Sequence, residues 1–135
     1  MKKLTKVWNK YYDESQKNTI LKDDSFFKLE IDAIIENLIL EINKIDKSSI
    51  KILELGSGTG FLASKIIQSL KKNKIQCNYT GIDFSIVAIQ KANNKKIKNC
   101  EFINSDFINF LKSNKEKYDF IITQRSIMAI MEKKS

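Results

Sequence analysis

The 135-residue sequence contains no histidine and no proline, only 4 glycines, 2 cysteines and a single arginine, Arg125. Without histidine, the chain lacks the commonest general base and the commonest transition-metal ligand, which argues against most metal-dependent and triad hydrolases. Cys77 and Cys100 lie far apart and have no CxxC spacing, so a disulfide scaffold or a zinc site is not expected. We therefore expect two ordinary buried thiols and no metal ion.

Long apolar runs are also missing. Charges interrupt the apolar stretches within a few residues, so no segment is expected to span a bilayer. The N-terminal MKKLTKVW has lysines but no apolar core of signal-peptide length. The hydrophobic share of 42% and the charged share of 30% are typical of a soluble globular protein. We expect one cytoplasmic domain with no membrane partner.

The formal net charge is +8, and nearly all of the positive charge is lysine. Such a charge ordinarily suggests that the protein binds nucleic acid. Lysine, however, lacks the rigid fork with which arginine reads phosphates and bases, and the lysines here are scattered. We do not expect nucleic acid to be the main partner, and RNA binding is kept as an alternative.

Strand-like and helix-like segments alternate along most of the chain. Residues 1–23 are expected to form one short helix and a loop, and apolar spacing predicts a helix from Asp24 to near Asp46. Short apolar runs predict strands at 50–55, 77–83, 100–106 and 118–124, with helices at 61–72, 85–96 and 107–113. This alternation predicts an α/β fold with a parallel sheet covered by helices.

Three of the glycines stand together in LELGSGTG, directly after the first predicted strand: Gly56, Gly58 and Gly60. The fourth glycine, Gly81, lies near the end of the next strand. In an open parallel sheet, ligands bind outside the carboxyl ends of the strands, where glycine lets the backbone come close to them. Amides at the start of the following helix can donate to an anionic group. The cluster therefore predicts a ligand site rather than a simple turn.

The glycine spacing also bears on the kind of ligand. A dinucleotide fingerprint requires a third glycine at position 61, where this chain has Phe61. Glu54 places a carboxylate close to the loop, which is unfavourable next to a pyrophosphate. A ligand that carries a cationic amine and a sulfonium suits this loop better, and a nucleotide-dependent oxidoreductase is only a distant alternative.

LELGSGTG resembles the first motif, (D/E)xGxGxG, of the class I S-adenosylmethionine-dependent methyltransferases. YTGIDFS, FINSDF and YDFIITQ resemble the next three motifs in the same order, and each is about one strand–helix unit from the last. The resemblance implies a Rossmann-like sheet of strand order 3-2-1-4 with S-adenosylmethionine as cofactor. The family core has further strands after the fourth, so we expect a truncated chain or a sheet completed by another chain. The fourth strand would then be an open edge that leaves room for self-association.

The resemblance also implies roles for single residues. Glu54 would lie near the methionine ammonium, and Asp83 would accept hydrogen bonds from both ribose hydroxyls. Ile82 and Phe84 would line the adenine pocket, and Asp106 would take the adenine amino group. As alternatives, Asp83 simply precedes a helix whose N-cap is Ser85, Asp106 caps the short helix at 107, and Glu54 orders the loop. The predicted cofactor-binding set is Glu54, Gly56, Ser57, Gly58, Gly60, Asp83, Phe84, Asp106 and Phe107.

No catalytic residue is assigned, because methyl transfer from a sulfonium mainly requires alignment of the acceptor. The (N/D)PP(Y/F/W) motif is absent, which argues against the amide and adenine N-methyltransferases. We expect a small-molecule acceptor; Arg125 would contact an anionic acceptor, unless it is simply a surface residue. Residues 24–135 would form the cofactor-binding core, and residues 1–23 a lid carrying Trp8, Tyr11 and Tyr12, unless these aromatics merely pack a helix. The alternatives are a non-catalytic cofactor-binding or interaction module and an RNA methyltransferase.

Overall fold

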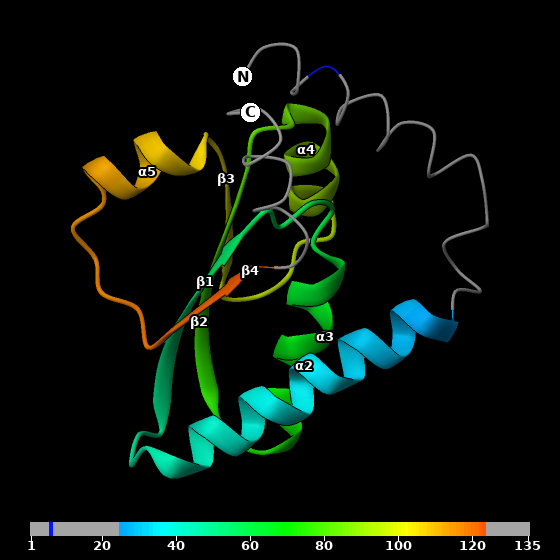
Figure 1. Ribbon diagram of the computed structural model, residues 1–135, viewed down its shortest axis with the longest axis vertical. Helices are drawn as coiled ribbons and strands as arrows, with labels where there is room; N and C mark the ends of the chain where they lie inside the picture. The colour runs from blue at the N-terminus through cyan, green and yellow to red at the C-terminus, as the bar shows by residue number, and fades with distance from the viewer. Residues whose placement is uncertain (1–5, 7–24, 124–135) are drawn as a thin grey trace, which may run out of the picture.

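The computed structural model describes Lys6 and residues 25–123, in which helices and strands alternate as expected (Figure 1). The elements follow in the order α2 (Ser25–Lys44), β1 (Ser49–Leu55), α3 (Phe61–Lys72), β2 (Gln76–Asp83), α4 (Ile86–Asn94), β3 (Cys100–Asn104), α5 (Phe107–Ser113) and β4 (Phe120–Thr123). The α/β class is confirmed.

The strands form a parallel sheet of order β3-β2-β1-β4, which confirms the predicted topology. β1 lies between β2 and β4, so its carboxyl end, where the glycine loop begins, is at the middle of the sheet. β3 and β4 are the two edge strands of the described sheet, and Ile121 on β4 is largely exposed. Self-association through the β4 edge stays a prediction.

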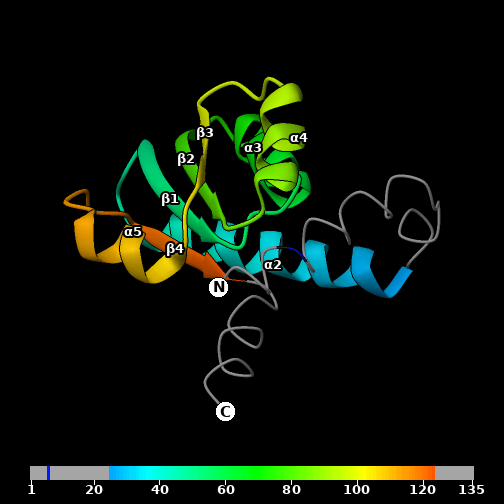
Figure 2. The same cartoon turned by 90° about the horizontal axis from the view of Figure 1, so that it is seen from above.

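Helices cover the two faces of the sheet unequally (Figures 1 and 2). The larger core joins α2, α3 and α4 to one face and includes Ile50 and Ile52 of β1. On the other face, α5 covers Leu53 and Leu55 with a smaller cluster. This division follows from the period of two in a strand, which sends successive side chains to opposite faces. Lys51 also belongs to the second face, but it is exposed because α5 covers only the part near the strands' carboxyl ends.

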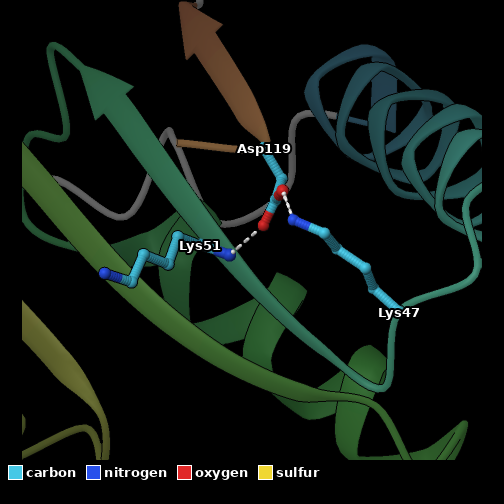
Figure 3. A network of polar contacts seen from close by, with 3 residues as sticks. All are labelled: Lys47, Lys51 and Asp119. Carbon is cyan, nitrogen blue, oxygen red and sulfur yellow. Dashed lines mark hydrogen bonds and ion pairs between the residues drawn. The ribbon is translucent and has the colours of Figure 1, made fainter. Parts of the chain in front are cut away.

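Hydrogen bonds link the start of β4 to β1 near the amino ends of the strands, away from the glycine loop (Figure 3). The backbone amide of Lys51 donates to Asp119 Oδ2 at 2.8 Å, and the amide of Asp119 donates to the carbonyl of Lys51 at 2.8 Å. Lys47 Nζ donates to Asp119 Oδ1 at 2.6 Å. These neighbours lower the pKa of Asp119, the Lys47 hydrogen bond most. The carboxylate thus sets the register of β4 against β1.

The predicted element boundaries were wrong by one or a few residues where a polar side chain ends an element. The helix predicted for 85–96 begins one residue later, because Ser85 is its N-cap and accepts a hydrogen bond from the Ala88 amide. It also ends before Lys96, whose φ of 50° is left-handed. The third strand stops at Asn104 rather than at Asp106, because Asp106 caps α5.

Several predictions lie outside the described residues. They include the aromatic lid with Trp8, Tyr11 and Tyr12, and the substrate contact of Arg125. The division into a lid and a core therefore stays a prediction. Among the helices that the structure describes, none combines the length and the apolar character needed to cross a membrane.

Candidate cofactor site

The glycine loop follows β1 and folds against the carboxyl end of β2. The amides of Gly56 and Ser57 both donate to the carbonyl of Ile82, at 2.7 and 3.0 Å. Gly56, Gly58 and Gly60 have φ angles of 81°, 56° and 83°, a left-handed region in which a side chain would be strained. The alternating glycines are therefore required by the backbone path of the loop, which brings it close to β2.

Asp83, the last residue of β2, joins this loop to the start of α4. It is buried, and its Oδ2 accepts a hydrogen bond from the Gly58 amide at 2.9 Å. Its Oδ1 accepts one from the Ser85 amide at 2.9 Å. Burial raises the pKa of Asp83, and the two backbone hydrogen bonds lower it again. Each carboxylate oxygen can accept more than one hydrogen bond, so ordering the loop does not prevent Asp83 from binding a ligand hydroxyl.

Glu54 lies beneath the loop on the face covered by α3 and α4, and its side chain is only 2% exposed. The hydroxyl of Tyr79 on β2 donates to Glu54 Oε1 at 2.6 Å. Burial raises the pKa of Glu54 to about 8; the hydrogen bond from Tyr79 lowers it, and the nearby charge of Asp83 raises it. At neutral pH, in the absence of a ligand cation, this carboxyl group is mostly protonated.

Ser57 carries the one buried side-chain oxygen that has no hydrogen-bond partner among the described residues. It occupies space left by Gly81, since a Cβ atom at position 81 would lie 2.6 Å from the Ser57 Cβ. A buried hydroxyl without a partner costs free energy unless a ligand or water satisfies it. This orphaned oxygen inside the glycine loop is an independent sign that the loop holds a polar ligand.

The start of α3 adds donors to the same place. Gly60 is its N-cap, and no described side chain caps this end of the helix. The first amides of a helix carry a partial positive charge and suit an anionic group such as a carboxylate. Together with Glu54 and Ser57, this end of α3 fits a ligand that has both an ammonium and a carboxylate, as the methionine part of S-adenosylmethionine has.

The remaining predicted residues lie at the carboxyl ends of β2 and β3. Asp106 caps α5, and its Oδ1 accepts a hydrogen bond from the Asn109 amide at 2.8 Å, as the capping alternative predicted. Phe84 and Phe107 are buried and pack together with ring centroids 6.1 Å apart. They belong to the smaller core, together with the fully buried Ile82. A contact of these residues with adenine stays a prediction.

The sequence did not predict two features of the site: the hydrogen bond between Tyr79 and Glu54, and the close approach of Gly81 and Ser57. Glu54 pairs with Gly81 across the two strands, and Tyr79 lies two residues earlier on the same face of β2. The alternation of side chains along both strands is the signal that could have found the first contact.

A separate pocket of about 360 Å³ opens at the other end of the sheet. Its lining includes Lys51, Asn78, Thr80 and Glu101, which lie on the part of the second face that α5 leaves uncovered. It contains none of the predicted cofactor-binding residues. We assign it no ligand.

Comparison with known proteins agrees with this arrangement. The family model described as methyltransferase domain matches residues 46–135. A relative from Mycoplasma mobile, the uncharacterized RNA methyltransferase MMOB5020, is 33% identical over 105 residues, which cover 73% of this chain and 26% of that protein.

Similar solved structures are methyltransferases as well. The plantazolicin methyltransferase BpumL, in complex with a pentazolic desmethylPZN analog and SAH, has a TM-score of 0.61 at 28% identity, covering 87% of this chain and 44% of that one. The CurJ carbon methyltransferase has a TM-score of 0.64 at 27% identity, covering 82% and 31%. The chain thus spans less than half the length of each of these proteins, and over that span it belongs to the methyltransferase domain family.

Proposed function

We propose that this chain is the cofactor-binding part of an S-adenosylmethionine-dependent methyltransferase. The observation that carries the proposal is Asp83, a buried carboxylate at the end of β2 that the Gly58 and Ser85 amides hold beside the glycine loop. The cofactor is S-adenosylmethionine, as the sequence motifs predicted. The structures of related methyltransferases with bound SAH or SAM support it.

The chain's own residues would hold this cofactor along the carboxyl ends of the strands. Glu54 would face the methionine ammonium, and the amides at the start of α3 would donate to the methionine carboxylate. Asp83 would accept hydrogen bonds from the ribose hydroxyls through lone pairs that the backbone amides leave available. Asp106 and Phe84 would contact the adenine. When bound, S-adenosylmethionine supplies a methyl group already activated by the sulfonium charge.

We propose a small molecule as the methyl acceptor. The similar structure of BpumL supports this choice, because it is a plantazolicin methyltransferase in complex with a pentazolic desmethylPZN analog. Such a reaction depends on holding the acceptor in line with the methyl–sulfur bond, and the chain's contribution is to fix the position of the cofactor. We assign no catalytic residue.

RNA as the acceptor is the second candidate. It is favoured by the net charge of +8 and by the similarity to an RNA methyltransferase of Mycoplasma mobile. An RNA-binding chain should lose affinity steeply as the salt concentration rises, because lysines that neutralise phosphates release counterions. Titration of a structured RNA at two salt concentrations separates the candidates, and no affinity at moderate salt would remove this one.

The cofactor proposal is tested by calorimetric titration of S-adenosylhomocysteine into the 135-residue chain. We expect saturable binding that weakens about 10- to 100-fold in Asp83→Ala, since the variant loses hydrogen bonds to a charged group. Asp46→Ala is the matched control, because this aspartate is exposed and follows α2, away from the glycine loop. Circular dichroism shows whether each variant is folded. A folded wild-type chain that does not bind, or an Asp83→Ala variant that binds equally well, would overturn the proposal.

A further inference from the structure

Beneath the glycine loop, two neighbouring strands bury a carboxyl group against a phenol. Glu54 and Tyr79 are 2% and 1% exposed, and their side-chain oxygens lie 2.6 Å apart. Tyr79 is the one hydrogen-bond donor to the Glu54 side chain among the described residues. A hydroxyl at the end of a rigid ring holds the carboxyl group in one position directly below the loop.

The surroundings of Glu54 contain no described cation within ion-pair distance. The titratable groups that act on the pair are Asp83 and Cys77 on β2 and Cys100 on β3, none of which carries positive charge. The helices α2, α3 and α4 contribute apolar side chains to this core. A carboxylate buried in this way, without a cation, is unfavourable and takes up a proton instead.

We propose that Tyr79 is a positioning residue of the cofactor site: its hydrogen bond holds the Glu54 carboxyl group below the glycine loop, and this carboxyl group releases a proton when the ammonium group of the cofactor binds. This inference rests on the function proposed above. The proton leaves the Glu54 carboxyl group for the solvent, the ammonium keeps its own protons, and the buried pair becomes a carboxylate next to a cation. No redox step or further reactant is involved.

The proposal predicts a specific dependence of affinity on pH. The pKa of Glu54 without ligand is about 8, and burial is the main cause. A bound ammonium lowers this pKa, so the bound state contains fewer protons than the free state and binding strengthens as the pH rises. If the bound pKa falls below 6, affinity should increase about 50-fold between pH 6 and pH 8. At pH 7 about 0.9 proton should be released for each ligand bound.

The test is calorimetric titration of S-adenosylhomocysteine at pH 7 in phosphate and in Tris, whose different ionisation enthalpies report the number of protons released. Wild-type protein alone suffices for this measurement. Glu54→Gln, which has nearly the same shape, should release no proton and bind with an affinity that is constant from pH 6 to pH 8. Tyr79→Phe should shift the pH dependence upward, because the phenol hydrogen bond lowers the pKa of Glu54.

The outcomes separate this inference from the proposed function. If S-adenosylhomocysteine binds without release of a proton, Glu54 is already ionised in the free protein and the inference is overturned while the proposed function stands. A pH dependence that Tyr79→Phe leaves at the same midpoint would remove the positioning role of Tyr79. If the folded wild-type chain does not bind at all, both fail together.

Discussion

Replacing Gly81 by alanine should push the glycine loop away from the sheet. Gly81 has no left-handed φ, in contrast to Gly56, Gly58 and Gly60, so a methyl group there does not strain its own backbone. The cost is steric, because the new Cβ would lie 2.6 Å from the Ser57 Cβ and 2.7 Å from the Phe102 Cδ1. Both distances are well below van der Waals contact.

Overpacking of this kind costs about 1–3 kcal/mol of the free energy of unfolding. For a domain of this size, each kcal/mol lowers the melting temperature by about 4 °C. Urea unfolding followed by circular dichroism measures the loss directly. The amides of Gly56 and Ser57 depend on contact with Ile82, so a displaced loop should also weaken binding of S-adenosylhomocysteine.

A second substitution tests whether Ser57 is the cause. Ser57→Gly removes the Cβ and Oγ atoms that lie 2.6 and 2.8 Å from the new methyl group. In the double variant, therefore, the two substitutions should be non-additive, with a coupling energy of about 1 kcal/mol or more in the stabilising direction. A Gly81→Ala variant as stable as wild type, or two substitutions whose effects simply add, would refute this account of how the loop packs on β2.

Two further predictions concern the ends of elements. Ser85→Ala should lower the free energy of unfolding by about 1 kcal/mol, since it removes the side chain that accepts from the Ala88 amide at the start of α4; an unchanged urea midpoint would contradict the cap. Asp119→Ala should cost about 1 kcal/mol at pH 7, because the Lys51 amide and Lys47 lose their acceptor. Since the pKa of Asp119 is lowered in the folded protein, its contribution is present above about pH 4 and disappears as the pH falls through the folded pKa. The difference in urea midpoint between wild type and Asp119→Ala should therefore close at acid pH, and a constant difference would contradict this role.

The sheet could be predicted from the sequence because its pattern is local. Branched apolar residues in short runs indicate the strands, and the segments between these runs have apolar residues at helical spacing. The order of the strands came from the resemblance of four successive motifs to a known family. The glycine loop was predicted for a correct physical reason, since its three alternating glycines all adopt left-handed φ angles.

What could not be predicted depends on contacts between distant segments. The place of Asp106 after a strand does not show whether it caps a helix; in the structure it caps α5, and its contact with a ligand stays a prediction. The hydrogen bond from Tyr79 to Glu54 requires the register of β1 against β2, which no single segment contains. The sequence predicted Asp119 as part of a strand. In the structure its carboxylate accepts hydrogen bonds from Lys47, 72 residues away, and from the backbone of β1.

The chain offers a direct reporter of its central site, because its 4 glycines all lie in the loop or on the strand beneath it. We would label the protein with ¹⁵N-glycine and record amide spectra while adding S-adenosylhomocysteine. If the cofactor binds at the glycine loop, the resonances of Gly56, Gly58 and Gly60 should shift together and saturate with one dissociation constant. Glycine resonances that stay in place in a folded chain, at ligand concentrations that saturate related methyltransferases, would contradict the assignment of this loop as the cofactor site.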